Sequence, residues 1–157
     1  MKNIKRLIIT GCRGVPSHYS GYEYFAEHLS MYLKKNDWEV IVYCQNNKTK
    51  PFITYWNGIK CININTLSYS SISTVIFDFV SIIHSLTFKK SIYLTLGYNT
   101  AIFNIIYFIF RKKNIINMDG IEWKREKWSL LVKVWFYINE KIAKIISTMM
   151  IADHPEI

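Results

Sequence analysis

The sequence predicts one α/β domain with a Rossmann-like parallel sheet and helices on both faces. Its 157 residues match the length of a single ordinary domain. Short apolar runs alternate with amphipathic segments of helical period along most of the chain. Several of the apolar runs end in a glycine or an acid, which is typical of buried parallel strands whose carboxyl ends border a ligand site.

The strands are expected where short apolar runs lie between turn residues. The expected parallel strands are residues 5–11, 39–44, 91–97, 114–119 and 148–153. Two further apolar runs, 52–56 and 59–64, flank Asn57-Gly58. This dipeptide is the strongest short signal for a hairpin turn. We therefore expect a hairpin appended to the parallel sheet.

Three helices are expected in the first 110 residues. The apolar residues between Tyr22 and Leu33 recur at helical spacing, and Lys34 and Lys35 follow in the last turn, where the helix dipole favours cations. Residues 72–86 are ambiguous between strand and helix by their period, but their length favours a helix. Residues 100–110 are expected to form a buried helix.

A fourth helix, amphipathic, is expected from Trp128 to Ser147. Its apolar residues recur at helical spacing, which predicts the face that packs against the core. The residues of that expected face are Leu131, Val134, Trp135, Ile138, Ile142 and Ile145.

Composition and charge exclude several classes of protein. With 50% apolar and 20% charged residues, the chain is not disordered. Its net charge of +9 attracts polyanions, anionic lipid surfaces or phosphorylated substrates, without choosing among them. The longest apolar run, 101–110, is too short for a membrane span. The three widely spaced cysteines indicate reduced thiols in a cytoplasmic protein and no zinc site.

The loop after the first strand is rich in glycine. Glycine at Gly11, Gly14 and Gly21 lets backbone amides approach a ligand closely, and the following helix N-terminus favours a phosphate. Arg13 can add a bidentate phosphate contact. The spacing matches neither the dinucleotide fingerprint nor a Walker loop. The alternative is a tight strand-to-helix turn with a solvent-facing arginine.

A second polar loop follows the strand 114–119. Asp119, at the strand tip, can orient a sugar hydroxyl or take its proton, and Glu122 is a second candidate for this role. Lys124 and Arg125 can contact a phosphate. The alternative is a solvated turn with a helix cap.

The segment from Trp123 to Lys144 combines lysines with tryptophans. Such a segment can lie on an anionic bilayer. The preferred alternative is a core helix with an exposed basic face. Nucleic acid is not an expected partner, because no recognition motif accompanies the charge.

Three blocks of this sequence resemble one group of glycosyltransferase family 4, the rhamnosyltransferase-like enzymes of bacterial polysaccharide assembly. The pattern G-x-R-G-[IV]-P-x-x-Y-G-G-x-E is matched by Gly11, Arg13, Gly14, Val15, Pro16, Tyr19, Gly21 and Glu23, with Ser20 in place of a glycine. The pattern D-G-x-E-W-K-R-x-K-W is matched by Asp119, Gly120, Glu122, Trp123, Lys124, Arg125, Lys127 and Trp128. The pattern I-A-D-S-P-E-I is matched by Ile151 to Ile157, with His154 in place of serine.

The resemblance implies that residues 1–157 are the N-terminal, acceptor-side half of a GT-B fold, without the C-terminal donor-binding domain. The implied activity is that of a retaining transferase, a rhamnosyltransferase. It would move sugar from a nucleotide-sugar such as dTDP-rhamnose to a polyprenyl-diphosphate-linked saccharide for lipopolysaccharide or capsule. The implied place is the cytoplasm, peripheral to the inner face of the plasma membrane. No metal and no cofactor are implied.

The resemblance also assigns site residues. Asp119 is the implied catalytic-site residue, as a positioning group. The implied substrate-binding residues are Arg13, Gly14, Val15, Pro16, Tyr19, Ser20, Gly21, Glu23, Gly120, Glu122, Trp123, Lys124 and Arg125. We expect Gly14, Gly21, Asp119 and Glu122 to border one cleft, because the carboxyl ends of parallel strands share one edge of the sheet. The alternatives are a non-catalytic binding module and one subunit of a split transferase that needs a separate C-terminal half.

Overall fold

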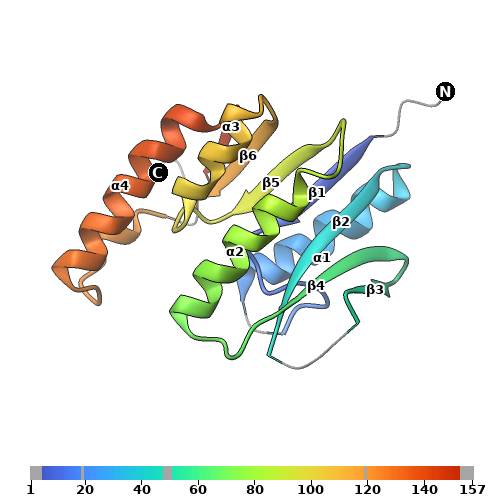
Figure 1. Ribbon diagram of the computed structural model, residues 1–157, viewed down its shortest axis with the longest axis horizontal. Coiled ribbons are helices and arrows are strands. Elements are labelled where there is room, and N and C mark those ends of the chain that lie inside the picture. Colours follow the sequence, from blue (N-terminus) through green and yellow to red (C-terminus); the bar gives the residue numbers. More distant parts are fainter. Residues whose placement is uncertain (1–4, 19, 48–50, 119, 153–157) are drawn as a thin grey trace.

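The computed structural model describes residues 5–18, 20–47, 51–118 and 120–152. These form one seven-stranded sheet with the order β3-β4-β2-β1-β5-β6-β7 (Figure 1). The strands are β1 (Arg6–Thr10), β2 (Glu39–Asn46), β3 (Ile53–Trp56), β4 (Ile59–Asn65), β5 (Ile92–Leu96), β6 (Lys113–Met118) and β7 (Met149–Ala152). The helices are α1 (Gly21–Lys35), α2 (Ser71–Ser85), α3 (Ile105–Ile109) and α4 (Leu130–Ile146), with short 3-10 helices at Ala101–Asn104 (η1) and Glu122–Lys124 (η2).

The sheet is parallel except at β3, which confirms the expected fold class. The predicted hairpin forms at Asn57 and Gly58, whose φ angles are 45° and 73°. The hairpin adds to one edge of the parallel sheet, as expected. β4 pairs in parallel with β2, with Ile41 opposite Lys60, and only β3 runs antiparallel at the edge. The neighbour that β4 takes could not be predicted, because a local turn signal does not reveal a long-range pairing.

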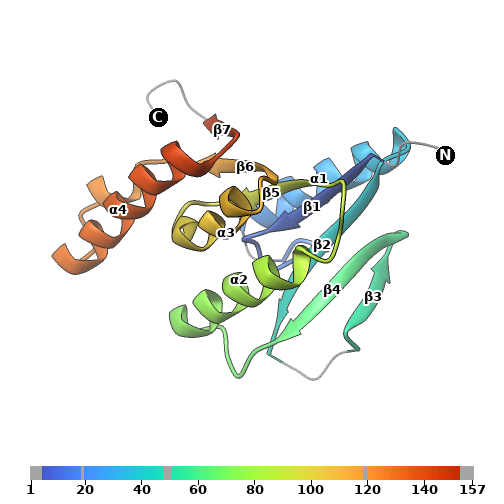
Figure 2. The ribbon, with the colours of Figure 1, turned by 45° about the horizontal axis from the view of Figure 1, so that its top comes forward.

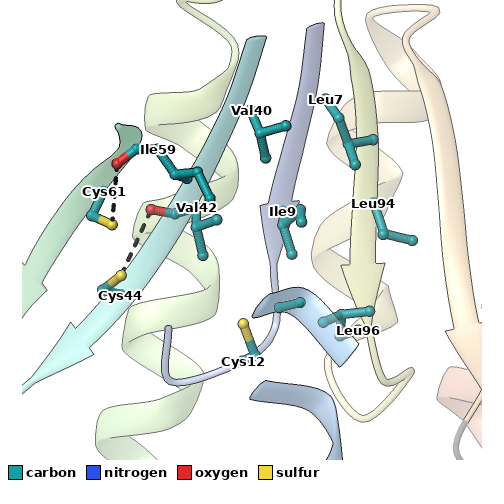
Figure 3. Close-up of a cluster of buried hydrophobic side chains, with 11 residues drawn as sticks. Leu7, Ile9, Cys12, Val40, Val42, Cys44, Ile59, Cys61, Leu94 and Leu96 are labelled. Atoms are coloured by element: carbon teal, nitrogen blue, oxygen red, sulfur yellow. Dashed lines mark hydrogen bonds between the residues drawn. The ribbon is translucent and has the colours of Figure 1, made fainter. Parts of the chain in front are cut away.

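Helices cover both faces of the sheet (Figure 2). α1 packs on one face, against a cluster from the central strands that includes Leu7, Val42 and Leu94. Figure 3 shows these side chains gathered on neighbouring strands. α2 and α3 pack on the other face, where Phe77 and Tyr107 join the second cluster. Burial on both faces explains why the strands read as continuous apolar runs.

The ambiguous segment 72–86 is helical. α2 begins after the N-cap Ser70, whose hydroxyl accepts a hydrogen bond from the Ser73 amide at 3.2 Å. The segment 100–110 is not one continuous helix but η1 followed by α3. η1 is held to α4 because the Ile102 amide donates to Asn139 Oδ1 at 2.9 Å.

The apolar face predicted for α4 was wrong. Leu131 is 82% exposed, and Val134, Ile138 and Ile145 are exposed with it. The helix instead packs through the residues Phe136, Asn139, Glu140, Ala143 and Ile146. Periodicity missed this face because two of its members are polar and are buried with hydrogen-bond partners.

Two further expectations from the sequence concern the cysteines and membrane-spanning helices. All three cysteines are buried thiols, with Cys44 and Cys61 in strands as expected and Cys12 in the loop after β1. In the described ranges, each helix is too short or too polar to cross a bilayer.

Candidate functional site

Two cavities flank the loop between β1 and α1, at the carboxyl ends of β1 and β2. The larger has a volume of about 670 Å³ and lies between this loop and the β3–β4 hairpin. The smaller, of about 290 Å³, lies between the loop and α2. Arg13, Glu23 and Gln45 line both cavities. The glycine-rich loop predicted to bind substrate therefore separates two cavities at the edge of the sheet where α/β proteins bind ligands.

Gly14 holds the loop against β2. Its φ is 116°, in the region that favours glycine, and a Cβ at this position would lie 2.7 Å from Cys44 Cβ. The bond between Val15 and Pro16 is cis, and both residues line the larger cavity. The path of the loop thus depends on a close backbone approach that no side chain permits.

Replacing Gly14 by alanine is expected to lower the free energy of unfolding by about 2 kcal/mol, from backbone strain and the contact with Cys44. Gly21→Ala is the matched control, because Gly21 is exposed and a Cβ there meets nothing within 4 Å. Urea denaturation of both variants measures the difference. Equal stability of the two would contradict the role of Gly14.

Ser20 and Glu23 anchor the start of α1. Ser20 is the N-cap and accepts a hydrogen bond from the Glu23 amide at 3.4 Å. This capping explains a serine where the resembling enzymes carry glycine. The Glu23 carboxylate is buried and accepts from the His18 amide at 2.9 Å. Glu23 therefore braces the loop while it borders both cavities.

Arg13 projects from the loop between the two cavities. Its side chain is exposed, as the turn interpretation expected, and its guanidinium carbon lies 4.9 Å from the centre of the Tyr69 ring. The Arg13 carbonyl accepts from the Gln45 amide at 3.1 Å, which ties the loop to β2. The arginine is thus held by its backbone and by an aromatic face while its charge borders both cavities.

The remaining predicted residues of the first loop do not all line a cavity. Ser20 lines the smaller cavity, and Gly21 lines neither of the two. Tyr19 lies outside the described residues. Their assignment to substrate binding stays a prediction.

The second predicted block packs onto α4. Glu122 is buried, accepts a hydrogen bond from Trp128 Nε1 at 2.9 Å and forms an ion pair with Arg125 at 3.0 Å. Trp123 Nε1 donates to Glu140 Oε2 at 2.6 Å. The Lys124 ammonium lies 5.6 Å from the centre of the Trp123 ring. The contacts of this block therefore fasten the segment after β6 to the helix.

The expected single cleft stays a prediction. Asp119 lies outside the described residues, and Gly120 next to it has a φ of 124°. Glu122 lines neither cavity beside the first loop. The parallel pairing does bring the carboxyl ends of β1 and β6 to the same edge of the sheet, with β5 between them.

Asp78 and Gln45 are among the cavity residues that sequence reasoning missed. Asp78 is the only acid in the apolar segment 72–86, and an isolated acid in such a segment could have marked it as a candidate site residue. Gln45 directly follows the expected strand 39–44. Burial raises the pKa of the Asp78 carboxyl to about 7, against the opposing hydrogen bond from Thr100. Burial also raises the pKa of the nearby Cys12 thiol to about 12, so this thiol is protonated at neutral pH.

No set of three His, Cys, Asp or Glu side chains suited to a metal ion occurs in the described ranges. The cavities offer instead a cation, amide groups and carboxylates, which suit a phosphorylated or hydroxyl-rich ligand.

Comparison with known proteins places the chain in a family. The family described as "Domain of unknown function (DUF1972)" matches residues 4–157. The chain belongs to this family. No curated protein sequence matches the DUF1972 chain.

Solved structures resemble the DUF1972 chain in fold. Sucrose-phosphate synthase from Thermosynechococcus elongatus aligns with 94% of this chain at a TM-score of 0.63 and 8% identity. α,α-Trehalose 6-phosphate synthase from Burkholderia multivorans aligns with 94% at a TM-score of 0.56 and 8% identity. The chain spans 47% and 39% of these two proteins, respectively. Both are GT-B glycosyltransferases, so the fold of the DUF1972 chain is GT-B-like.

Proposed function

We propose that this chain is the acceptor-side domain of a retaining glycosyltransferase. The observation that carries the proposal is the position of the G-x-R-G-V-P loop, which separates two cavities at the carboxyl edge of a GT-B-like sheet. By resemblance, the transferred sugar is rhamnose and the donor is a nucleotide-sugar such as dTDP-rhamnose. The acceptor is a polyprenyl-diphosphate-linked saccharide.

The chemistry of the first loop suits a diphosphate. Arg13 carries a positive charge at the boundary of both cavities, and the amino end of α1 lies at the end of the same loop. Asp119 is proposed to orient a sugar hydroxyl. The second block, which Glu122 and Trp123 hold through hydrogen bonds to their neighbours, would then support the loop that carries Asp119.

A second Rossmann-like unit is needed for transfer under this proposal. The chain spans 47% and 39% of the two matched synthases. A GT-B site lies between two such units, so one unit provides one wall of the site. The second unit is proposed to be the donor-binding half, on the same polypeptide or on a separate subunit.

We also propose that the outward faces of α2, α3 and α4 contact an anionic bilayer. Ile72, on α2, is 74% exposed, and Ile76, Phe79 and Ile83 continue the same outward stripe. The exposed apolar residues of the other two helices are Phe108, Ile109, Leu130, Leu131, Val134, Trp135, Tyr137, Ile138 and Ile145. All three helices lie on the same side of the sheet (Figure 2). Exposed apolar surface of this extent marks an interaction site.

Charge favours a bilayer with anionic lipids as the occupant. The three helices are described in full, and their only acids, Asp78 and Glu140, are both buried. Lys133 and Lys141 lie on α4 beside the apolar residues, whereas Lys144 forms an ion pair with Glu140 at 2.8 Å. Trp123 and Trp128 pack in the core cluster under α4, so they are not part of this surface. The surface is therefore apolar and positively charged, which suits anionic lipid.

The function is tested by titrating the chain with a water-soluble, short-chain prenyl diphosphate carrying one monosaccharide. We expect saturable binding that Arg13→Ala weakens by about 10-fold or more, because a charge-assisted hydrogen bond is lost. Lys35→Ala, which removes an exposed cation at the end of α1, is the matched control. The chain alone is expected to transfer no sugar from a nucleotide-sugar. Turnover by the chain alone, or equal binding by Arg13→Ala, would contradict the proposal.

A further inference from the structure

Asp78 is a buried acid on the inner side of an otherwise apolar helix. Its side chain is 7% exposed, in the middle of α2. Its Oδ2 accepts a hydrogen bond from Thr100 Oγ1 at 2.8 Å. Its Oδ1 is shielded from solvent and has no hydrogen-bond partner within the described part of the chain. A buried polar atom left in this state costs free energy, so it calls for an explanation.

Asp78 lines the smaller cavity, so a bound ligand could supply the missing hydrogen-bond donor. Asp78, Thr74 and Phe77 line it from α2, and Gln45 lines it from the end of β2. Gln45 Nε2 donates to Thr66 Oγ1 at 3.4 Å. Gln45 Oε1 is buried and, like Asp78 Oδ1, has no hydrogen-bond partner among the described residues. Two residues from different elements therefore line one cavity, and each carries a buried oxygen without a donor among the described residues.

The structure assigns this cavity as a hydroxyl-binding subsite in which Asp78 and Gln45 accept hydrogen bonds from neighbouring hydroxyls of one pyranose ring. A ligand that supplies two donors satisfies both oxygens. The volume of about 290 Å³ suits one small ring rather than a whole nucleotide. Arg13 lines the same cavity, and its charge disfavours an amine as the donor group. The assignment rests on the proposed transferase function, because it names the part of the substrate that this site holds.

Several titratable or polar groups surround Asp78. Cys12, Arg13 and Glu23 line the same cavity from the loop and α1, and Thr100 contacts Asp78 from the other side. Hydroxyl donors stabilise the ionised carboxylate. Glycoside binding is therefore expected to strengthen as pH rises from about 6 to about 8, through the range in which Asp78 ionises.

The test is a titration of the isotopically labelled chain with methyl pyranosides, read by backbone amide shifts. Tetrahydropyran, the same ring without hydroxyls, is the chemical control. We expect saturable shifts centred on Gln45, Asp78 and Thr100, at least 10-fold weaker binding in Asp78→Asn, and loss of the pH dependence. Asp37→Asn, the same change at an exposed turn, is expected to bind like the unmodified chain. Asp78→Ser is a second variant in case Asp78→Asn does not fold.

Unchanged glycoside binding in both Asp78 variants, equal response to tetrahydropyran, or no saturable shift from any methyl pyranoside would overturn the assignment. Failure of the proposed function has a different signature. Glycoside shifts at Asp78 without binding of the prenyl diphosphate sugar would retain the subsite and remove the transferase proposal. Binding of that diphosphate without shifts around Asp78 would remove the subsite alone.

Discussion

Replacing Asp78 by asparagine is expected to stabilise the folded chain by up to about 4 kcal/mol at pH 8. Burial raises the pKa of this carboxyl from 3.8 to about 7. Above pH 7 the folded chain must therefore hold a buried charge, whereas the unfolded chain exposes it to water. Asparagine has nearly the same shape and carries no charge, so the substitution removes this cost.

The pH dependence has a defined sign. Between about pH 4 and pH 7, folded Asp78 binds more protons than unfolded Asp78, so the contribution of Asp78 to stability falls as pH rises. Urea denaturation at pH 5 and pH 8 should show a larger gain for Asp78→Asn at pH 8. Asp37→Asn, on the exposed turn after α1, should show no such gain. If Asp78→Asn were less stable than the unmodified chain at pH 8, the ionised Asp78 carboxylate would stabilise the folded chain, and the prediction would be wrong.

Replacing Ile76 and Ile83 by aspartate is expected to weaken binding to anionic vesicles by about 100-fold or more. Both side chains are exposed on the outward stripe of α2. Burial of one such side chain contributes about 1.5–3 kcal/mol, and the new carboxylates are repelled by anionic lipid. Sedimentation with vesicles of phosphatidylserine and phosphatidylcholine measures the change.

The control introduces two aspartates on the opposite side of the sheet. Tyr24 and Tyr32 are exposed on α1, so their aspartate variants should sediment with vesicles like the unmodified chain. Binding should also weaken from 0.1 M to 1 M salt, where the Debye length falls from about 10 Å to about 3 Å. Negligible binding to both lipids at low salt, together with concentration-dependent self-association, would assign the surface to protein contact instead.

The role of the first loop could be predicted only in part from its residues. Its glycines, its arginine and its place after a strand predicted a binding loop, and the structure puts Arg13 and Gly14 at a cavity. The reason for Gly14 could not be predicted, because its contact with Cys44 joins residues distant in sequence. Asp78 was missed because burial and hydrogen bonding of one helical acid depend on Thr100 and on the loop after β1, which is brought there by folding.

By itself, the sequence determined the α/β class, the alternation of strands and helices, and the turn at Asn57-Gly58. These features follow from local periodicity and turn chemistry, which act over a few residues. Only the tertiary structure decided that β4 joins the parallel sheet, that α4 turns Asn139 and Glu140 inward, and that Asp78 borders a cavity. Each of these depends on hydrogen bonds and burial between distant segments, and a buried polar residue with a partner has the same sequence pattern as an exposed one.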